Sequence, residues 1–462
     1  MNYAKRTGNV YSTSGMRAIY RSGVPDAVNT YNTPVSSVTQ DREQGLYIQD
    51  KWRPTRKLTL NMGLRFETNY GWMPATCQEQ TDFIAAQCFD AIDGAPDWKA
   101  VNPRFSAVYD LAGDGMTALK FAANRYVVPV GVQVVGRINP VRSTNDTRQW
   151  RPQSRCGEAT TLGCDRNGDL IPQLDELGPS SGYNLGTTAR YAEGYDWPNA
   201  NEYTVEIQRQ LPGNLVVTAG YVRREKRNQL GSRNVAVPAE SYIPLVVTER
   251  NSGRTVTVYN QAPSLRGRLD TVWDNDPEVD STYNGGDLTL NKRLSDGWMM
   301  TGGISLGKNV GYVGNSDLNN PNSKEFSRGI AGDDVPVSVR LSGLYELPWG
   351  VSVSGSFQHQ KGFPESTSVS IGNNTVALTQ GTTSLMIEPR GDTRYPNLNQ
   401  LDISIRKAIR SGGAVFQPRL DLYNLTNAAT IRTWVTQLGP TYHRPSAIQR
   451  GLLIKAGMHI DF

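Results

Sequence analysis

The feature that most constrains this chain is a repeated alternation of apolar and polar residues with a period of two. In residues 58–66, every even-numbered residue is apolar and every odd-numbered residue is polar or glycine. The same alternation occurs in residues 203–208, 401–406 and 452–462. A strand with this pattern turns one face toward an apolar medium and the other toward a polar one.

About fifteen such runs follow one another along the chain, so the sequence predicts an all-β fold. The runs begin near Val10, Asp26, Gln44, Lys57, Asn102, Met116, Asn201, Asn214, Gly285, Trp298, Val335, Val351, Pro396, Ala414 and Gly451.

From Gln44 onward, short connections between these runs alternate with long ones. In an outer-membrane barrel, short turns lie on the periplasmic rim and long loops on the outer rim, and strands cross with about ten alternating residues. The sequence therefore predicts an antiparallel transmembrane β-barrel that occupies residues 1–462. Its long extracellular loops are expected at residues 71–101, 128–199, 228–284, 310–334, 365–395 and 432–450.

Composition excludes several other classes of protein. No stretch has the roughly 18 consecutive apolar residues of a transmembrane helix. The 48 basic and 43 acidic residues form no run of like charge, so nothing indicates a nucleic-acid partner. Tyr70, Trp72, Trp298 and Trp349 lie near strand ends, as the interfacial aromatic residues of barrels do. A soluble all-β protein is the alternative, but no second set of apolar faces remains to form a separate domain.

The four cysteines form two pairs that are close in sequence, Cys77 with Cys88 and Cys156 with Cys164. Neither pair has CxxC spacing and the chain has only three histidines, so a zinc site is not expected. Two local disulfides would fit an oxidising compartment outside the cytoplasm. Four free thiols in a reducing compartment are the alternative, and other pairings are formally open.

Residues 165–176 have the spacing of a twelve-residue calcium loop. Leu170 stands where such loops have glycine, and Pro172 restricts the second half, so we expect weak affinity. A polar surface turn that binds no ion is the alternative interpretation. The expected calcium ligands are the side chains of Asp165, Asn167, Asp169 and Glu176 and the carbonyl oxygen of Ile171.

Catalysis has little support in the sequence. No nucleophile elbow, P-loop, metalloprotease motif or Ser/His/Asp spacing is present. His359, His443 and His459 lie in runs or loops without an evident partner for general-base chemistry. We therefore expect a protein that is not an enzyme, with calcium as the one candidate cofactor.

Several segments resemble TonB-dependent outer-membrane receptors, and the resemblance extends over nearly the whole chain. It is most similar to the Oar-like subgroup, in which the barrel follows a carboxypeptidase-regulatory-like domain. The segments that carry the resemblance are residues 45–54, 58–67, 102–105, 202–214, 291–298, 344–350, 396–402 and 421–427.

This resemblance implies a 22-stranded barrel with a signal sequence, a TonB-contacting segment and a plug. None of these N-terminal parts is recognisable here, so we expect the C-terminal part of such a barrel, unable to transport alone. The last strand resembles the signal that the barrel-assembly machinery recognises. The alternative is that it is only the last strand that closes the barrel, and both can be true together. The residues of this expected signal are Ile454, Met458, Ile460 and Phe462.

The expected function is therefore a receptor and transporter for TonB-dependent uptake, in the outer membrane of a Gram-negative bacterium. Expected partners are outer-membrane lipid, the assembly machinery and, through a plug, the TonB complex. The long loops 128–199 and 228–284 are the expected place for ligand contact. Their aromatic and arginine side chains permit glycan or peptide binding, but the sequence does not identify the substrate. Alternatives are an adhesin or structural barrel without active uptake, and a soluble secreted carbohydrate-binding β-protein.

Overall fold

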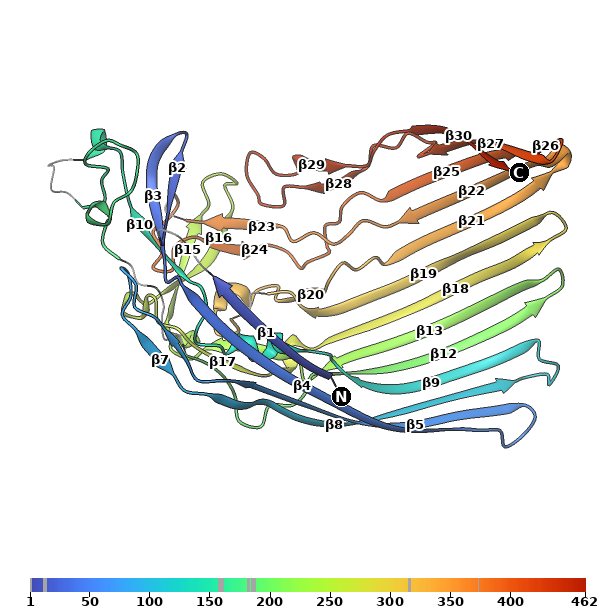
Figure 1. Cartoon of the computed structure of the whole chain (residues 1–462), viewed down its shortest axis with the longest axis horizontal. Coiled ribbons are helices and arrows are strands. Elements are labelled where there is room, and N and C mark those ends of the chain that lie inside the picture. Colours follow the sequence, from blue (N-terminus) through green and yellow to red (C-terminus); the bar gives the residue numbers. More distant parts are fainter. Residues whose placement is uncertain are drawn as a thin grey trace.

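One antiparallel sheet of sixteen strands forms the wall of the molecule (Figure 1). The computed structural model describes residues 2–10, 15–156, 162–180, 183, 188–314, 317–372 and 374–462. Two wall strands, β20 (Arg328–Ile330) and β26 (Ile409–Ser411), have three residues each. The others have nine or more: β1 (Asn2–Val10), β4 (Val35–Trp52), β5 (Leu58–Met73), β8 (Ile92–Asp110), β9 (Thr117–Val127), β12 (Asn199–Leu211), β13 (Leu215–Arg227), β18 (Ser281–Ser295), β19 (Trp298–Tyr312), β21 (Val337–Leu347), β22 (Val351–Gln360), β25 (Leu398–Lys407), β27 (Ala414–Tyr423) and β30 (Leu453–Asp461).

The two faces of the wall differ as the alternation predicts. Leu46 lies opposite Phe66, and Ile48 lies opposite Leu64, on neighbouring strands β4 and β5. Leu46 and Ile48 are 75% and 73% exposed, and with Phe66 and Leu64 they form an apolar face of the wall. In water such a surface would be unfavourable by about 25 cal/mol per Å². In a bilayer, lipid tails cover it, and this explains why so many large apolar side chains of the wall stay exposed.

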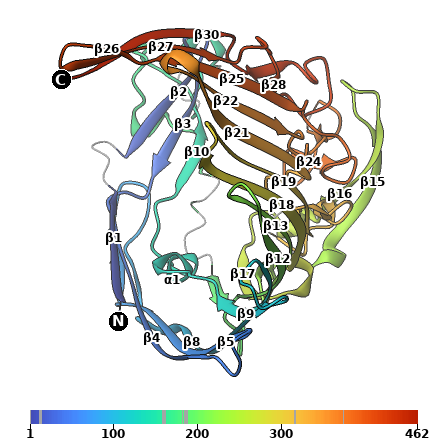
Figure 2. The same cartoon turned by 90° about the vertical axis from the view of Figure 1, so that its right-hand side faces the viewer.

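The wall curves round so that β1 and β30 form its two ends (Figure 2). β1 pairs with β4 and β30 pairs with β27. Within the residues that the structure describes, neither end strand has a second neighbour. The predicted all-β antiparallel fold class is confirmed, and the wall is a curved sheet with two unpaired edges.

The run predicted near Val10 begins at the end of wall strand β1, and its residues 11–14 lie outside the described residues. The strand predicted near Asp26 is wrong as a wall strand. It corresponds to β3 (Val24–Tyr31), which lies between β2 (Met16–Arg21) and β10 (Asn145–Gln149) in a separate small sheet. The wall instead begins with β1. This strand was not predicted, because Lys5 and Arg6 interrupt the alternation of apolar and polar residues. All predicted runs from Gln44 onward lie in long wall strands.

The outer segments contain little helix and several small sheets. The α-helix α1 (Val132–Arg137) is short, and no described helix is long and apolar enough to cross a membrane. The remaining small strands are β6 (Thr76–Gln78) with β7 (Gln87–Phe89), β11 (Thr188–Tyr191) with β17 (Asp270–Asn275) and β14 (Leu230–Asn234), β15 (Tyr242–Thr248) with β16 (Thr255–Gln261), β23 (Ser368–Ile371) with β24 (Thr383–Met386), and β28 (Ile431–Trp434) with β29 (Pro445–Ile448).

Four clusters of buried apolar side chains lie among these outer segments and the adjoining strand ends. One joins β15–β16 to β23–β24 around Val258, Val369 and Ile371, all fully buried. Another packs Val28 against Trp150, which lies more than a hundred residues later in the chain. The outer loops are therefore folded against one another rather than extended separately.

Candidate functional site

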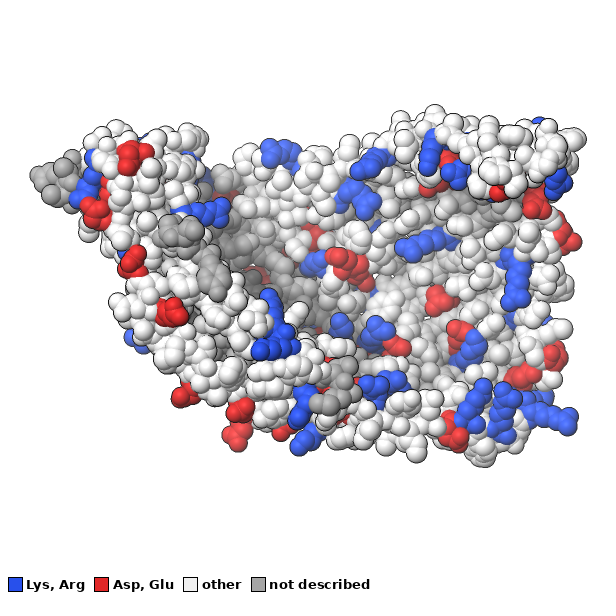
Figure 3. Space-filling model, viewed as in Figure 1, with Lys and Arg blue, Asp and Glu red and all other residues white. Residues whose placement is uncertain are grey.

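The inner face of the wall is polar, and its charges are arranged in pairs of opposite sign. Lys120 Nζ lies 2.6 Å from Glu206 Oε1, between β9 and β12. Arg65 Nε lies 2.8 Å from Glu67 Oε1 on β5. Figure 3 shows basic and acidic side chains interspersed over the hollowed face rather than gathered into one patch of a single sign. Such a wall suits a water-filled passage or a contact with another polar protein segment.

A buried polar network lies on this inner face near the outer end of β4, β5 and β8. Asn69 Nδ2 donates to Asp41 Oδ1 at 2.6 Å, and Asn102 Nδ2 donates to Glu67 Oε2 at 2.7 Å. Asn69 and Asn102 are fully buried. These hydrogen bonds satisfy the side-chain amide N–H groups, whereas the Oδ1 atom of each asparagine is buried without a partner among the described residues.

Helix α1 lies against the inner face beside this network (Figure 2). A Cβ atom on Gly71 would come within 2.5 Å of Val135 Cγ2, so only glycine fits here without movement of the helix. The loop 128–199, which the sequence assigns to the outer rim, therefore begins by folding back against the wall.

Aromatic residues of the same loop form a packed cluster with Trp98 of β8. The rings of Trp98 and Trp197 stack at 5.6 Å, and those of Tyr191 and Tyr195 stack at 4.3 Å. The Tyr191 hydroxyl donates to the Val134 carbonyl at 2.8 Å. Burial raises the pKa of both tyrosines, so their hydroxyls stay neutral. Tyr191, Tyr195 and Trp197 are therefore packed within the protein, where they hold this loop in place.

Two disulfides brace the outer segments, between the cysteines that are close in sequence. Cys77 is joined to Cys88 across the β6–β7 pair, with Cα atoms 4.0 Å apart. Cys156 is joined to Cys164, with Cα atoms 5.9 Å apart. The described residues contain no free cysteine.

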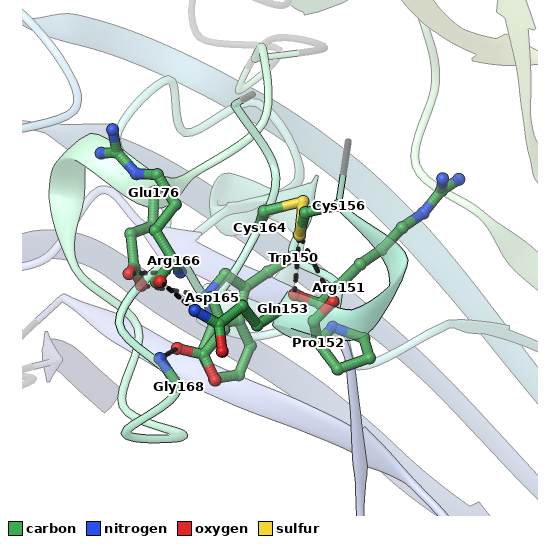
Figure 4. Close-up of a disulfide and its surroundings, with 10 residues drawn as sticks. All are labelled: Trp150, Arg151, Pro152, Gln153, Cys156, Cys164, Asp165, Arg166, Gly168 and Glu176. Carbon is green, nitrogen blue, oxygen red and sulfur yellow. Dashed lines mark hydrogen bonds between the residues drawn. A yellow bond between two sulfur atoms is a disulfide. The ribbon is translucent and has the colours of Figure 1, made fainter. Parts of the chain in front are cut away.

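The expected calcium loop lies next to the second disulfide (Figure 4). The Asp165 carboxylate is buried and accepts the backbone N–H groups of Gly168 at 2.9 Å and Leu170 at 3.2 Å. Leu170 has a φ of +61°, the left-handed conformation for which glycine is favoured at this position. The backbone therefore adopts the sharp turn despite the side chain.

Glu176 closes the same turn from its far end. Its carboxylate is 2% exposed and accepts the backbone N–H of Arg166 at 2.8 Å and the Trp150 indole N–H at 3.2 Å. It also forms a capping box with Gln173 at the short 3-10 helix η2 (Leu174–Glu176). Protein donors thus occupy much of its capacity to accept hydrogen bonds.

The five expected calcium ligands lie in one turn, but the described residues contain no group of three or more His, Cys, Asp or Glu side chains arranged to hold a metal. A hydrogen bond from the Ile171 N–H lowers the pKa of Asp169, which keeps that exposed carboxylate ionised. Calcium binding stays a prediction. Its expected ligands are Asp165, Asn167, Asp169, Ile171 and Glu176.

A buried carboxylate connects two other outer loops. Glu365 is 1% exposed and accepts the Trp434 indole N–H at 2.7 Å. Thr367 donates to the same carboxylate at 3.2 Å, and His443 Nε2 lies 3.4 Å from it. Loops 365–395 and 432–450 are therefore held together by a polar contact in addition to apolar packing.

The C-terminal strand has the outward apolar face that the sequence predicts. Ile454, Met458 and Ile460 lie opposite Leu422, Pro418 and Phe416 of β27 respectively. All of β30 is exposed, and Phe462 is fully exposed at its end. Its free edge is accessible for pairing with another strand, and recognition by the assembly machinery stays a prediction.

Comparison with known proteins identifies the kind of domain. The family described as "Outer membrane beta barrel domain" matches residues 4–359. No curated protein matches the chain.

Among solved structures, the siderophore receptor PiuA from Acinetobacter baumannii is similar, with 13% identity and a TM-score of 0.48 over 95% of this chain and 44% of that one. The FrpB iron transporter from Neisseria meningitidis has 10% identity and a TM-score of 0.49 over 95% and 54%. The outer membrane transporter YddB from Escherichia coli has 10% identity and a TM-score of 0.46 over 95% and 60%.

The chain thus spans about half the length of these structures. The family match covers most of the chain and agrees with a wall whose outward side chains are apolar. The chain belongs to the outer membrane beta barrel domain family, and its location is the outer membrane of a Gram-negative bacterium.

Proposed function

We propose that the chain is the C-terminal barrel portion of a TonB-dependent receptor of the Oar-like subgroup, which takes up a large or scarce substrate. The observation that carries the proposal is the pair of unpaired wall edges, β1 and β30, in the described residues. Within a bilayer, every backbone N–H and C=O group needs a protein partner. Further strands between these edges would supply those partners and enlarge the barrel toward the size of the receptor family.

The sequence segments that resemble the receptor family support the same proposal. Residues 45–54 and 58–67 lie at β4, β5 and the turn between them, and residues 421–427 lie at the outer end of β27. The polar inner wall would face the plug of the complete receptor, and opposite charges would pair across that contact.

An adhesin without active uptake is the second candidate function. The observation that favours it is the packed state of the outer loops, which have their own apolar cores and two disulfides. A rigid outer surface suits lasting attachment, whereas uptake needs a ligand to pass inward.

The test is to express the gene with its native upstream DNA and to measure the mass of the mature protein in the outer-membrane fraction. We expect a mass well above 50.9 kDa, with a plug in the same chain. Growth on candidate substrates should then require TonB. A mature protein of 50.9 kDa would contradict the fragment proposal. A larger protein that binds cells or surfaces equally well without TonB would favour the adhesin.

A further inference from the structure

A hollow of about 770 Å³ opens between the outer loops 228–284 and 365–395. Its lining includes Tyr242, Arg266 and Arg268 from the first loop and Thr379 and Gln380 from the second. It lies beside the apolar core that joins β15–β16 to β23–β24. This volume is in the range of sites that hold small organic ligands.

Hydrogen bonds between the two loops fix the wall of this hollow. The Gln380 side chain accepts the backbone N–H of Gln261 at 2.9 Å and donates to the Tyr259 carbonyl at 2.7 Å. The Asn260 side chain accepts the Thr379 N–H at 2.7 Å. The shape of the hollow is therefore set before any ligand arrives, which lowers the entropy cost of binding.

The turn that carries the two arginines is also held by the backbone. The Arg268 N–H donates to the Leu265 carbonyl at 3.1 Å, and the Arg268 carbonyl accepts from Asn234 Nδ2 at 2.9 Å. Gly267 has a φ of +75° between the two arginines, which a residue with a side chain would adopt only with strain. Both arginines thus lie on one turn, held by hydrogen bonds, at the rim of the hollow.

The side-chain groups left available in the hollow are mainly donors. Among the described residues, the guanidinium groups of Arg266 and Arg268 have no ion pair or hydrogen bond, and they are exposed. The hydroxyls of Tyr242 and Thr379 are likewise without a partner there. Burial and the nearby carboxylate of Asp317 raise the pKa of Tyr242, and that carboxylate already accepts the backbone N–H groups of Asn234 and Asn319.

These groups favour an anionic ligand that also carries hydroxyl groups. A guanidinium binds carboxylate or sulfate oxygens with two parallel hydrogen bonds, and hydroxyl groups exchange hydrogen bonds with the hydroxyls of sugars. We infer that this hollow binds an acidic oligosaccharide, with Arg266 and Arg268 on its anionic groups. The inference rests on the proposed function, because it names the class of ligand that such a receptor would recognise.

The test is calorimetric titration of the purified full chain in detergent micelles. The acidic probes are trigalacturonic acid and a sulfated chondroitin disaccharide, and the methyl ester of trigalacturonic acid is the uncharged match. We expect at least one acidic probe to bind and the ester to bind about tenfold more weakly or not at all. Arg266→Gln with Arg268→Gln should weaken binding about tenfold or more, and added salt should weaken it further.

Arg250→Gln is the matched control, because Arg250 is an exposed arginine of the same outer loop that does not line the hollow. It should change affinity less than about twofold. The inference is overturned if neither acidic probe binds, if the ester binds equally well, or if the control variant weakens binding as much as the double variant. Such a failure would leave the mass and TonB measurements unaffected, so the proposed function would be judged separately.

Discussion

The wall and the outer loops are both built from β-strands with alternating apolar and polar residues. Apolar side chains stay exposed on the outside of the wall, whereas in the outer loops they are buried. In the wall, Val205 on β12 faces outward and stays 45% exposed. In the outer loops, Val258 and Ile371 are fully buried in a core between two hairpins. The difference shows that the same alternation suits two solvents: lipid around the wall, and water around loops that must therefore pack together.

The largest expected effect is on the core of the outer loops. Ile371→Ala should destabilise the β15–β16 and β23–β24 hairpins by about 2–5 kcal/mol, because it leaves a cavity. Hydrogen exchange of their backbone amides would measure the loss of protection. Leu288→Ala on the outward wall face is the control, because lipid can fill the space there. Equal loss of protection in both variants would contradict the proposed difference between the buried core of the outer loops and the lipid-facing wall.

A charge on the wall tests the lipid contact directly. Val205→Arg should destabilise the inserted protein by about 2–4 kcal/mol in urea unfolding from liposomes, because the charge enters the apolar layer. Val246→Arg on β15 is the matched control, since Val246 is 74% exposed in an outer hairpin, and it should change stability by less than about 0.5 kcal/mol. A harmless Val205→Arg would mean that this face is not in lipid.

Removal of a disulfide should affect only the outer loops. Cys156→Ser with Cys164→Ser should cost about 2–3 kcal/mol of local stability in residues 145–180, because the unfolded loop gains freedom. Limited proteolysis would detect the change as faster cleavage in this region. The wall should keep its resistance to unfolding in detergent, and a general loss of that resistance would show that the loops and the wall do not unfold separately.

The smallest expected effect is that of calcium on residues 165–176. Millimolar calcium should slow hydrogen exchange in this turn modestly, with a weak dissociation constant of about 10⁻⁴–10⁻³ M. Asp169→Asn should remove the effect, because it takes away an exposed negative charge among the expected ligands. The same protection in a chelating buffer would identify the segment as a polar turn that needs no ion.

Local pattern was enough to predict the long wall strands from Gln44 onward, because each of them has a lipid-facing apolar row that shows directly in the sequence. It missed the three-residue strands β20 and β26, which are too short to show an alternation. It failed at β1, where Lys5 and Arg6 interrupt any such row. It also failed at β3, whose alternation reflects packing against Trp150 rather than contact with lipid. An alternating run predicts that a strand has one apolar and one polar face. It does not predict whether lipid or another part of the protein covers the apolar face.

The calcium motif was visible in the sequence by spacing alone, whereas the burial of Asp165 and Glu176 was not. The sequence predicted ligand contact in loop 228–284, but it did not predict the hollow beside Arg266 and Arg268, since the wall of that hollow combines loops more than a hundred residues apart. No local signal marks such a site, because neither loop forms the hollow without the other.

The all-β character, the two different faces of the wall and the positions of its turns follow from neighbouring residues, so they can be read from the sequence. The packing of the outer loops against one another, the position of α1 against the wall and the place of the hollow cannot. Those features depend on contacts between distant segments, which form only after the strands have paired and brought their connecting loops to the same rim.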